Sequence, residues 1–128
     1  MYTPLKIPIF KKQIIDHDRY KSQILQQIKD YSFACIKKNT LDIASDYELS
    51  RDHPRPYLDT IRSRVKDCLL DFAKISTHYK DVEIRCFFYQ QYEKEQYHGW
   101  HVHDCQYSGV YYLDMPSDTP KTEYIDPF

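Results

Sequence analysis

Two histidines separated by one residue, His101 and His103, are the side chains whose types and spacing best suit chemistry. Side chains at positions i and i+2 of a β-strand point to the same face, so these two imidazoles can converge on one ion. Neutral imidazole binds iron, zinc, copper and nickel. A metal site normally needs a third protein ligand, and no histidine follows His103. The pair predicts two ligands of a metal site and leaves the third unidentified; the alternative is an exposed pair without a metal.

Other residues near the pair are weaker candidates for the third ligand. Asp104 would point to the opposite face of a regular strand, and His98 would reach the ion only if a β-bulge re-aimed it. We expect His98 to lie in a loop beside the site and Trp100 to pack under the sheet. Three further histidines fall in helix-edge or loop segments and are not expected to bind the metal: His17, His53 and His78.

Length and composition indicate one soluble domain. A chain of 128 residues is one domain by size, and its formal net charge of −1 gives no basic excess for binding nucleic acid. No apolar run approaches the length of a membrane span, and the N-terminus lacks the apolar core of a signal peptide. The four cysteines form no CxxC pair, which favours free thiols in a reducing cytoplasm.

Two helices are expected in the first part of the chain, residues 1–80, after a short edge strand at Leu5–Phe10. The first should be capped by Asp16 or Asp18 and run to about Phe33. The second should run from about Leu58 to Ser76. Its apolar residues recur at helical spacing and should face the core: Leu58, Ile61, Val65, Leu69 and Phe72.

Strands are expected in the second part, residues 81–128. Alternate residues from Val82 to Tyr89 form two sets, with Val82, Ile84, Cys86 and Phe88 in one, and this period of two predicts a strand over Val82–Tyr92. The other expected strands are Trp100–His103, Ser108–Leu113 and Lys121–Ile125. Helices followed by strands indicate an α+β fold in which the helices back a largely antiparallel sheet. The polar stretch Thr40–Pro56 should be a surface loop.

The segment around the histidine pair resembles a known family. YEKEQYHGWHVH, from Tyr92 to His103, and SGVYYL, from Ser108 to Leu113, resemble the 2-oxoglutarate- and Fe(II)-dependent oxygenases. The likeness is greatest to small proteins of this class from marine phages and bacteria, and it extends to the prolyl hydroxylases. It covers roughly Cys86 to Phe128. This places the chain in a bacterial or phage-infected host cytoplasm.

The resemblance implies a fold, cofactors and roles for residues. The fold would be a double-stranded β-helix, a cupin-like jelly-roll with N-terminal helices packed on one sheet. His101 and His103 would bind Fe(II), with His103 at a position that usually holds aspartate. Tyr112, and less strongly Tyr92, would hydrogen-bond 2-oxoglutarate. The activity implied is hydroxylation of a small molecule or peptide, with ascorbate as a reductant.

The chain departs from that family in two respects. Neither the distal histidine nor the Arg or Lys that holds the 2-oxoglutarate carboxylate is identifiable after His103. About five strands are expected where a jelly-roll needs roughly eight, so the chain resembles a C-terminally truncated member. An incomplete barrel leaves a sheet edge uncovered, which predicts a homodimer. We expect the isolated monomer to turn over 2-oxoglutarate slowly or not at all.

Two other functions fit the same residues. Cupins also use an HxH pair, but the glutamate expected four or five residues later is absent here. A non-catalytic structural or binding module that retains the fold is the alternative from a different class. Metal stoichiometry distinguishes the non-catalytic module from the other two functions, because the enzyme and the cupin each need one tightly held ion per site.

Overall fold

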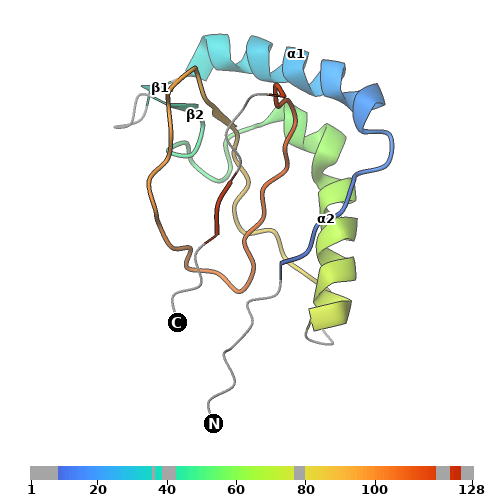
Figure 1. Cartoon of the computed structure of the whole chain (residues 1–128). Coiled ribbons are helices and arrows are strands. Elements are labelled where there is room, and N and C mark those ends of the chain that lie inside the picture. The colour runs from blue at the N-terminus through green and yellow to red at the C-terminus, as the bar shows by residue number, and fades with distance from the viewer. Residues whose placement is uncertain (1–8, 36, 39–42, 77–79, 118–121, 125–128) are drawn as a thin grey trace.

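The computed structural model describes residues 9–35, 37–38, 43–76, 80–117 and 122–124 (Figure 1). For residues 32–35 and 37–38 it describes the backbone only. The elements follow in the order α1 (His17–Cys35), β1 (Lys37–Lys38), β2 (Ala44–Ser45), α2 (Pro56–Ser76) and β3 (Gln90–Gln91). Four sequence predictions lie wholly or partly outside the described residues: the strands Leu5–Phe10 and Lys121–Ile125, the loop Thr40–Pro56, and His78.

Helix α1 begins immediately after Asp16, as expected from its sequence. The carbonyl oxygen of Asp16 accepts hydrogen bonds from two backbone amides of the first turn, at 3.0 and 3.3 Å. Asp16 has a φ of 64°, in the left-handed region that aspartate tolerates better than most residues. Asp18 places a negative charge at the positive end of the helix dipole. The helix ends at Cys35, two residues beyond the predicted Phe33.

Helix α2 begins at Pro56, two residues before the predicted start at Leu58, and ends at Ser76 as predicted. Proline suits the first position of a helix because its missing amide would have no partner there. Asp59 in the first turn and Lys74 in the last turn both match the direction of the helix dipole. The charges and the proline therefore fix the orientation and the start of α2.

The core forms where the two helices meet the C-terminal half of the chain. It contains Ile24, Ile28, Tyr57, Leu58, Ile61 and Tyr89, with Val65, Phe87, Tyr111 and Leu113 partly buried against them. The predicted apolar face of α2 is therefore buried at its N-terminal end and half-buried at Val65, Leu69 and Phe72. Its buried end packs against the segments around residues 87–89 and 111–113, where the prediction placed a sheet; neither of these described segments is assigned as a strand (Figure 1).

The sheet is small. Strand β2 pairs antiparallel with β1 and with β3, each strand having two residues, and Ala44 lies opposite Gln91. Of the predicted strand Val82–Tyr92, only Gln90–Gln91 is paired; Trp100–His103 and Ser108–Leu113 have no assigned strand. These short strands neither establish nor exclude a jelly-roll, which stays a prediction.

A buried carboxylate fixes the start of the segment that carries the histidine pair. Asp46, only 2 % exposed, accepts hydrogen bonds from Tyr89 N at 2.9 Å, Arg55 Nε at 2.8 Å and Tyr57 Oη at 2.6 Å. The hydroxyl of Ser45 donates to the Tyr89 carbonyl at 2.8 Å. Burial and the bond to Asp46 raise the pKa of Tyr57. Together these bonds tie Tyr89, and β3 immediately after it, to α2.

The other end of that segment is held by aromatic side chains. Tyr107 packs edge-on against Phe72 of α2, with ring centroids 5.2 Å apart. The hydroxyl of Tyr111 lies 2.7 Å from Nδ1 of His17 at the start of α1. Residues 92–106 therefore form a loop between two anchored ends, and Figure 1 shows the orange part of this loop away from α2. We call residues 92–106 the histidine loop.

Candidate metal centre

The histidine loop brings His101 and His103 together. Their Nε2 atoms lie 3.1 Å apart, and their ring centroids are 4.8 Å apart with planes inclined by 68°. Two nitrogens bound in adjacent positions, each about 2.1 Å from an ion, are separated by roughly 3 Å. The spacing of the two Nε2 atoms therefore fits two adjacent ligands of one first-row metal ion.

A backbone carbonyl fixes the tautomer of His101. Its Nδ1 lies 2.9 Å from the carbonyl oxygen of Gly99. Because a carbonyl oxygen only accepts, Nδ1 must carry the proton, and the neutral ring then presents a lone pair at Nε2. A metal-binding histidine commonly donates its other N–H to a carbonyl or carboxylate in this way. In the ion-free molecule, Nε2–H of His103 can donate to Nε2 of His101.

His98 lies against the pair without completing it. Its ring stacks on that of His101, with centroids 4.1 Å apart and planes inclined by 19°. Burial, followed by the neighbouring charges of His101 and His103, lowers the pKa of His98. Within the described ranges, no group of three or more His, Cys, Asp or Glu side chains is arranged to hold a metal. His98 is therefore a neighbour in the loop, and the third ligand is not supplied by the described residues.

The three other residues weighed from the sequence, two histidines and Asp104, are engaged elsewhere or exposed. His17 contacts Tyr111, and the ring of His53 packs on that of Tyr31 with centroids 5.8 Å apart. Asp104, next to His103, is exposed.

The prediction that Trp100 packs under the sheet was wrong, because 65 % of its surface is exposed. The histidine loop pairs with no strand in the described part of the chain, so it offers Trp100 no sheet face to pack against.

The two tyrosines assigned to 2-oxoglutarate are both partly exposed. The Tyr92 hydroxyl donates to Oε1 of Gln90 at 2.9 Å, and burial raises the pKa of Tyr92. Tyr112 is 44 % exposed, and its proximity, after burial, contributes to raising the pKa of Tyr124. Within the described residues, neither hydroxyl hydrogen-bonds to His101 or His103. Their role toward 2-oxoglutarate stays a prediction.

The histidine loop is exposed and presents large apolar side chains beside charged ones such as Lys94 and Asp104. Three of its large side chains point into solvent: Tyr97 is 79 % exposed, Trp100 65 % and Val102 96 %. Val102 lies between the two ligand positions in sequence. An ion bound by His101 and His103 would therefore lie at the surface, with the rest of its coordination sphere facing outward.

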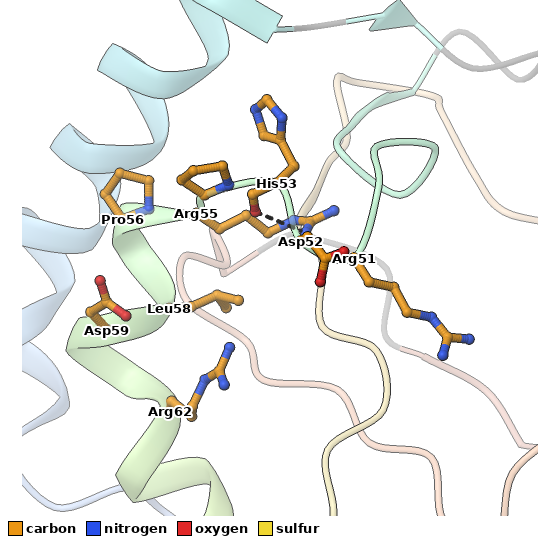
Figure 2. A pocket seen from close by; sticks show the side chains of 9 residues that line it. Arg51, Asp52, His53, Arg55, Pro56, Leu58, Asp59 and Arg62 are labelled. Atoms are coloured by element: carbon orange, nitrogen blue, oxygen red, sulfur yellow. Dashed lines mark hydrogen bonds between the residues drawn. The ribbon is translucent and has the colours of Figure 1, made fainter.

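A hollow elsewhere was not anticipated from the sequence. It has a volume of about 310 Å³ and lies where the loop after β2 enters α2 (Figure 2). Arg51, Arg62, Asp52 and Asp59 give its lining charges of both signs, and Leu58 and Arg62 project into it from α2. None of the residues assigned to metal or 2-oxoglutarate lines it, so it is separate from the histidine pair.

Comparison with known proteins found no family model, no curated protein and no solved structure that matches this chain. Neither described helix combines the length and apolar character needed to cross a bilayer.

Proposed function

We propose that this chain is an iron-binding protein of the 2-oxoglutarate-dependent oxygenase type, with His101 and His103 as two of the metal ligands. The observation that carries the proposal is the 3.1 Å spacing of the two Nε2 atoms. The carbonyl of Gly99, which orients His101, supports it. The resemblance of Tyr92–His103 and Ser108–Leu113 to that family suggests iron over the other first-row metals.

The protein's own residues hold the ion and determine how much of its charge is neutralised by its ligands. Both ligands are neutral, so the full +2 charge of the ion remains to attract an anionic co-ligand such as the carboxylate of a 2-oxo acid. Bound iron, with 2-oxoglutarate and dioxygen, supplies the oxidation of a C–H bond. Tyr112 and Tyr92 are proposed to donate hydrogen bonds to 2-oxoglutarate.

Activity is expected to be low in the isolated chain. Two imidazoles hold a divalent ion weakly, and no Arg or Lys is assigned to the far carboxylate of 2-oxoglutarate. Such a charge-assisted hydrogen bond contributes about 1.5–3 kcal/mol. We therefore expect weak 2-oxoglutarate binding and slow release of succinate.

A non-catalytic metal-binding module is the second candidate. It is favoured by the exposure of Trp100 and Val102 around the pair, because oxygenase chemistry usually proceeds in a site closed to water. The cupin-like alternative would share the ion and lack the response to 2-oxoglutarate.

Anaerobic titration separates these functions. The protein is loaded with Fe(II), and 2-oxoglutarate is added while the visible spectrum is recorded. The oxygenase type predicts a weak charge-transfer band, followed by succinate release when air and ascorbate are admitted. His101→Ala should abolish the band, whereas His53→Ala, which changes a histidine in the hollow, should retain it. Iron binding without any band would favour the non-catalytic module.

A further inference from the structure

We propose that a second copy of this chain completes the metal centre, so that one divalent ion is bound by His101 and His103 of both copies. This rests on the proposed metal pair and adds the partner that supplies the remaining ligands. The inference starts from the two ligand nitrogens, 3.1 Å apart on an exposed loop. An ion held there keeps vacant positions on its outward side.

Two-fold symmetry doubles an incomplete ligand set without any additional type of residue. In a symmetric dimer the same surface is used by both copies, and an ion on the axis is contacted identically by each. Two imidazoles from each copy give four nitrogen ligands, which is the usual number for a closed metal site. No other group of side chains in the described ranges is arranged to supply them.

The surface around the histidines has the composition of an interface. Trp100 and Val102 flank His101 directly, and Tyr97 lies nearby; all three are largely exposed. Tryptophan and tyrosine are enriched at protein interfaces, where their burial contributes much of the binding energy. Trp100 and Val102 alternate with the two histidines, so in an extended backbone their side chains face away from the pair, and the dimer would cover them only in part, at the edges of the interface.

Charge explains why the association should require the ion. Between Tyr97 and Gln106 the only charged residue is Asp104, with the histidines neutral. Asp104 follows His103 directly and would point away from the pair in an extended backbone, so the two carboxylates of a dimer add negative charge near the axis without contacting the ion. This charge opposes association in the absence of the cation, so the dimer should be metal-dependent.

Completion of the metal centre by a second copy also predicts slower turnover of 2-oxoglutarate. Four protein nitrogens leave at most two positions on a six-coordinate ion, too few for bidentate 2-oxoglutarate and dioxygen together. The dimer should therefore turn over more slowly than a monomer that holds its own ion.

Sedimentation velocity of the full chain, with EDTA or with Zn(II), tests the proposal. Zn(II) is the probe because it prefers four ligands and has no redox chemistry. We expect a monomer in EDTA and a dimer containing one zinc per two chains. Trp100 is the only tryptophan, so its emission should shift to shorter wavelength as the dimer forms. His103→Ala should stay monomeric with zinc, and His53→Ala should behave like the unmodified chain.

The outcomes separate this inference from the proposed function. One zinc per chain on a monomer would overturn the shared centre and leave the proposed metal pair standing. A dimer that persists in EDTA or in His103→Ala would also overturn it. Failure to bind zinc or iron at all would overturn both the shared centre and the proposed function.

Discussion

A single proton on His101 decides which of its ring nitrogens can accept a metal ion. The Gly99 carbonyl, 2.9 Å from Nδ1, holds that proton on Nδ1 and leaves Nε2 free. We predict that neutral His101 is the Nδ1–H tautomer in the metal-free protein. Long-range ¹H–¹⁵N correlation spectra would show this directly, and an Nε2–H tautomer would contradict it. Gly99→Ala is the matched control, because a Cβ there meets no atom within 4 Å and the carbonyl is retained.

The sequence could predict the histidine pair but not the rest of the site. Two side chains two positions apart need only a locally extended backbone to lie together, so their convergence follows from spacing alone. The exposure of Trp100 did not follow, because it depends on whether another strand pairs with the loop. A third metal ligand would likewise have to come from a distant segment or another chain, which leaves no local pattern.

At the scale of the elements, the buried carboxylate of Asp46 connects the loop after β2, helix α2 and the residue before β3. Its partner Arg55 is also buried, with a side chain 6 % exposed. Asp46→Ala removes the carboxylate partner of this arginine, whose guanidinium keeps hydrogen bonds to four backbone carbonyls. Breaking a buried ion pair costs about 3–5 kcal/mol, and the remaining bonds place this cost toward the lower end. We therefore predict a loss of that order in the free energy of unfolding, measured by urea denaturation.

Two variants show whether the loss is specific to the carboxylate. Tyr57→Phe removes one hydrogen bond and should cost about 1–2 kcal/mol. Asp52→Asn, on an exposed residue of the same loop, should cost less than about 0.5 kcal/mol. An Asp46→Ala variant as stable as Asp52→Asn would refute the role of the network.

Asp46 was missed by the sequence prediction of a surface loop at Thr40–Pro56. In the described part, residues 43–56, Ile43, Ser45 and Asp46 are all buried. Composition indicated exposure because polar residues are usually solvated. Burial of Asp46 depends on Arg55, Tyr57 and the Tyr89 amide arriving from other elements, which composition does not report.

The segment before α1 is attached to α2 by an ion pair with a predictable pH response. Lys12 pairs with Asp71, and Phe10 stacks on Phe72 with centroids 5.5 Å apart. The hydrogen bond from Lys12 lowers the pKa of Asp71 below its ordinary value of 3.8. A carboxylate with a lowered pKa stabilises the fold above its unfolded-state pKa, and this stability is lost as pH falls through the folded-state value.

We therefore predict that Asp71→Asn weakens the fall in stability below about pH 4 and has a small effect at pH 7. Unfolding by urea at pH 7 and pH 3 measures both quantities. Glu83→Gln, which neutralises an exposed carboxylate away from this pair in sequence, is the control. An acid response identical in Asp71→Asn and the unmodified chain would show that the pair contributes nothing.

For the whole molecule, local patterns predicted the helices better than the sheet. Helices α1 and α2 follow from apolar residues at helical spacing and from charges that match the dipoles, all of which lie within each segment. Strand pairing depends on residues far apart, and the alternation in Val82–Tyr89 does not specify a partner strand. Hence the two helices were predicted to within two residues, while β1 and β2 were not anticipated and the jelly-roll stays a prediction.

Binding of Fe(II) under argon tests most directly whether His101 and His103 are metal ligands. Equilibrium dialysis should compare the unmodified chain with His101→Ala, His103→Ala and the control His53→Ala, each checked for unchanged helix content by circular dichroism. We predict at least tenfold weaker binding in each of the first two variants, since one ligand nitrogen is lost, and unchanged binding in the third. Equal iron affinity in all four proteins would contradict the assignment of the histidine pair as a metal centre.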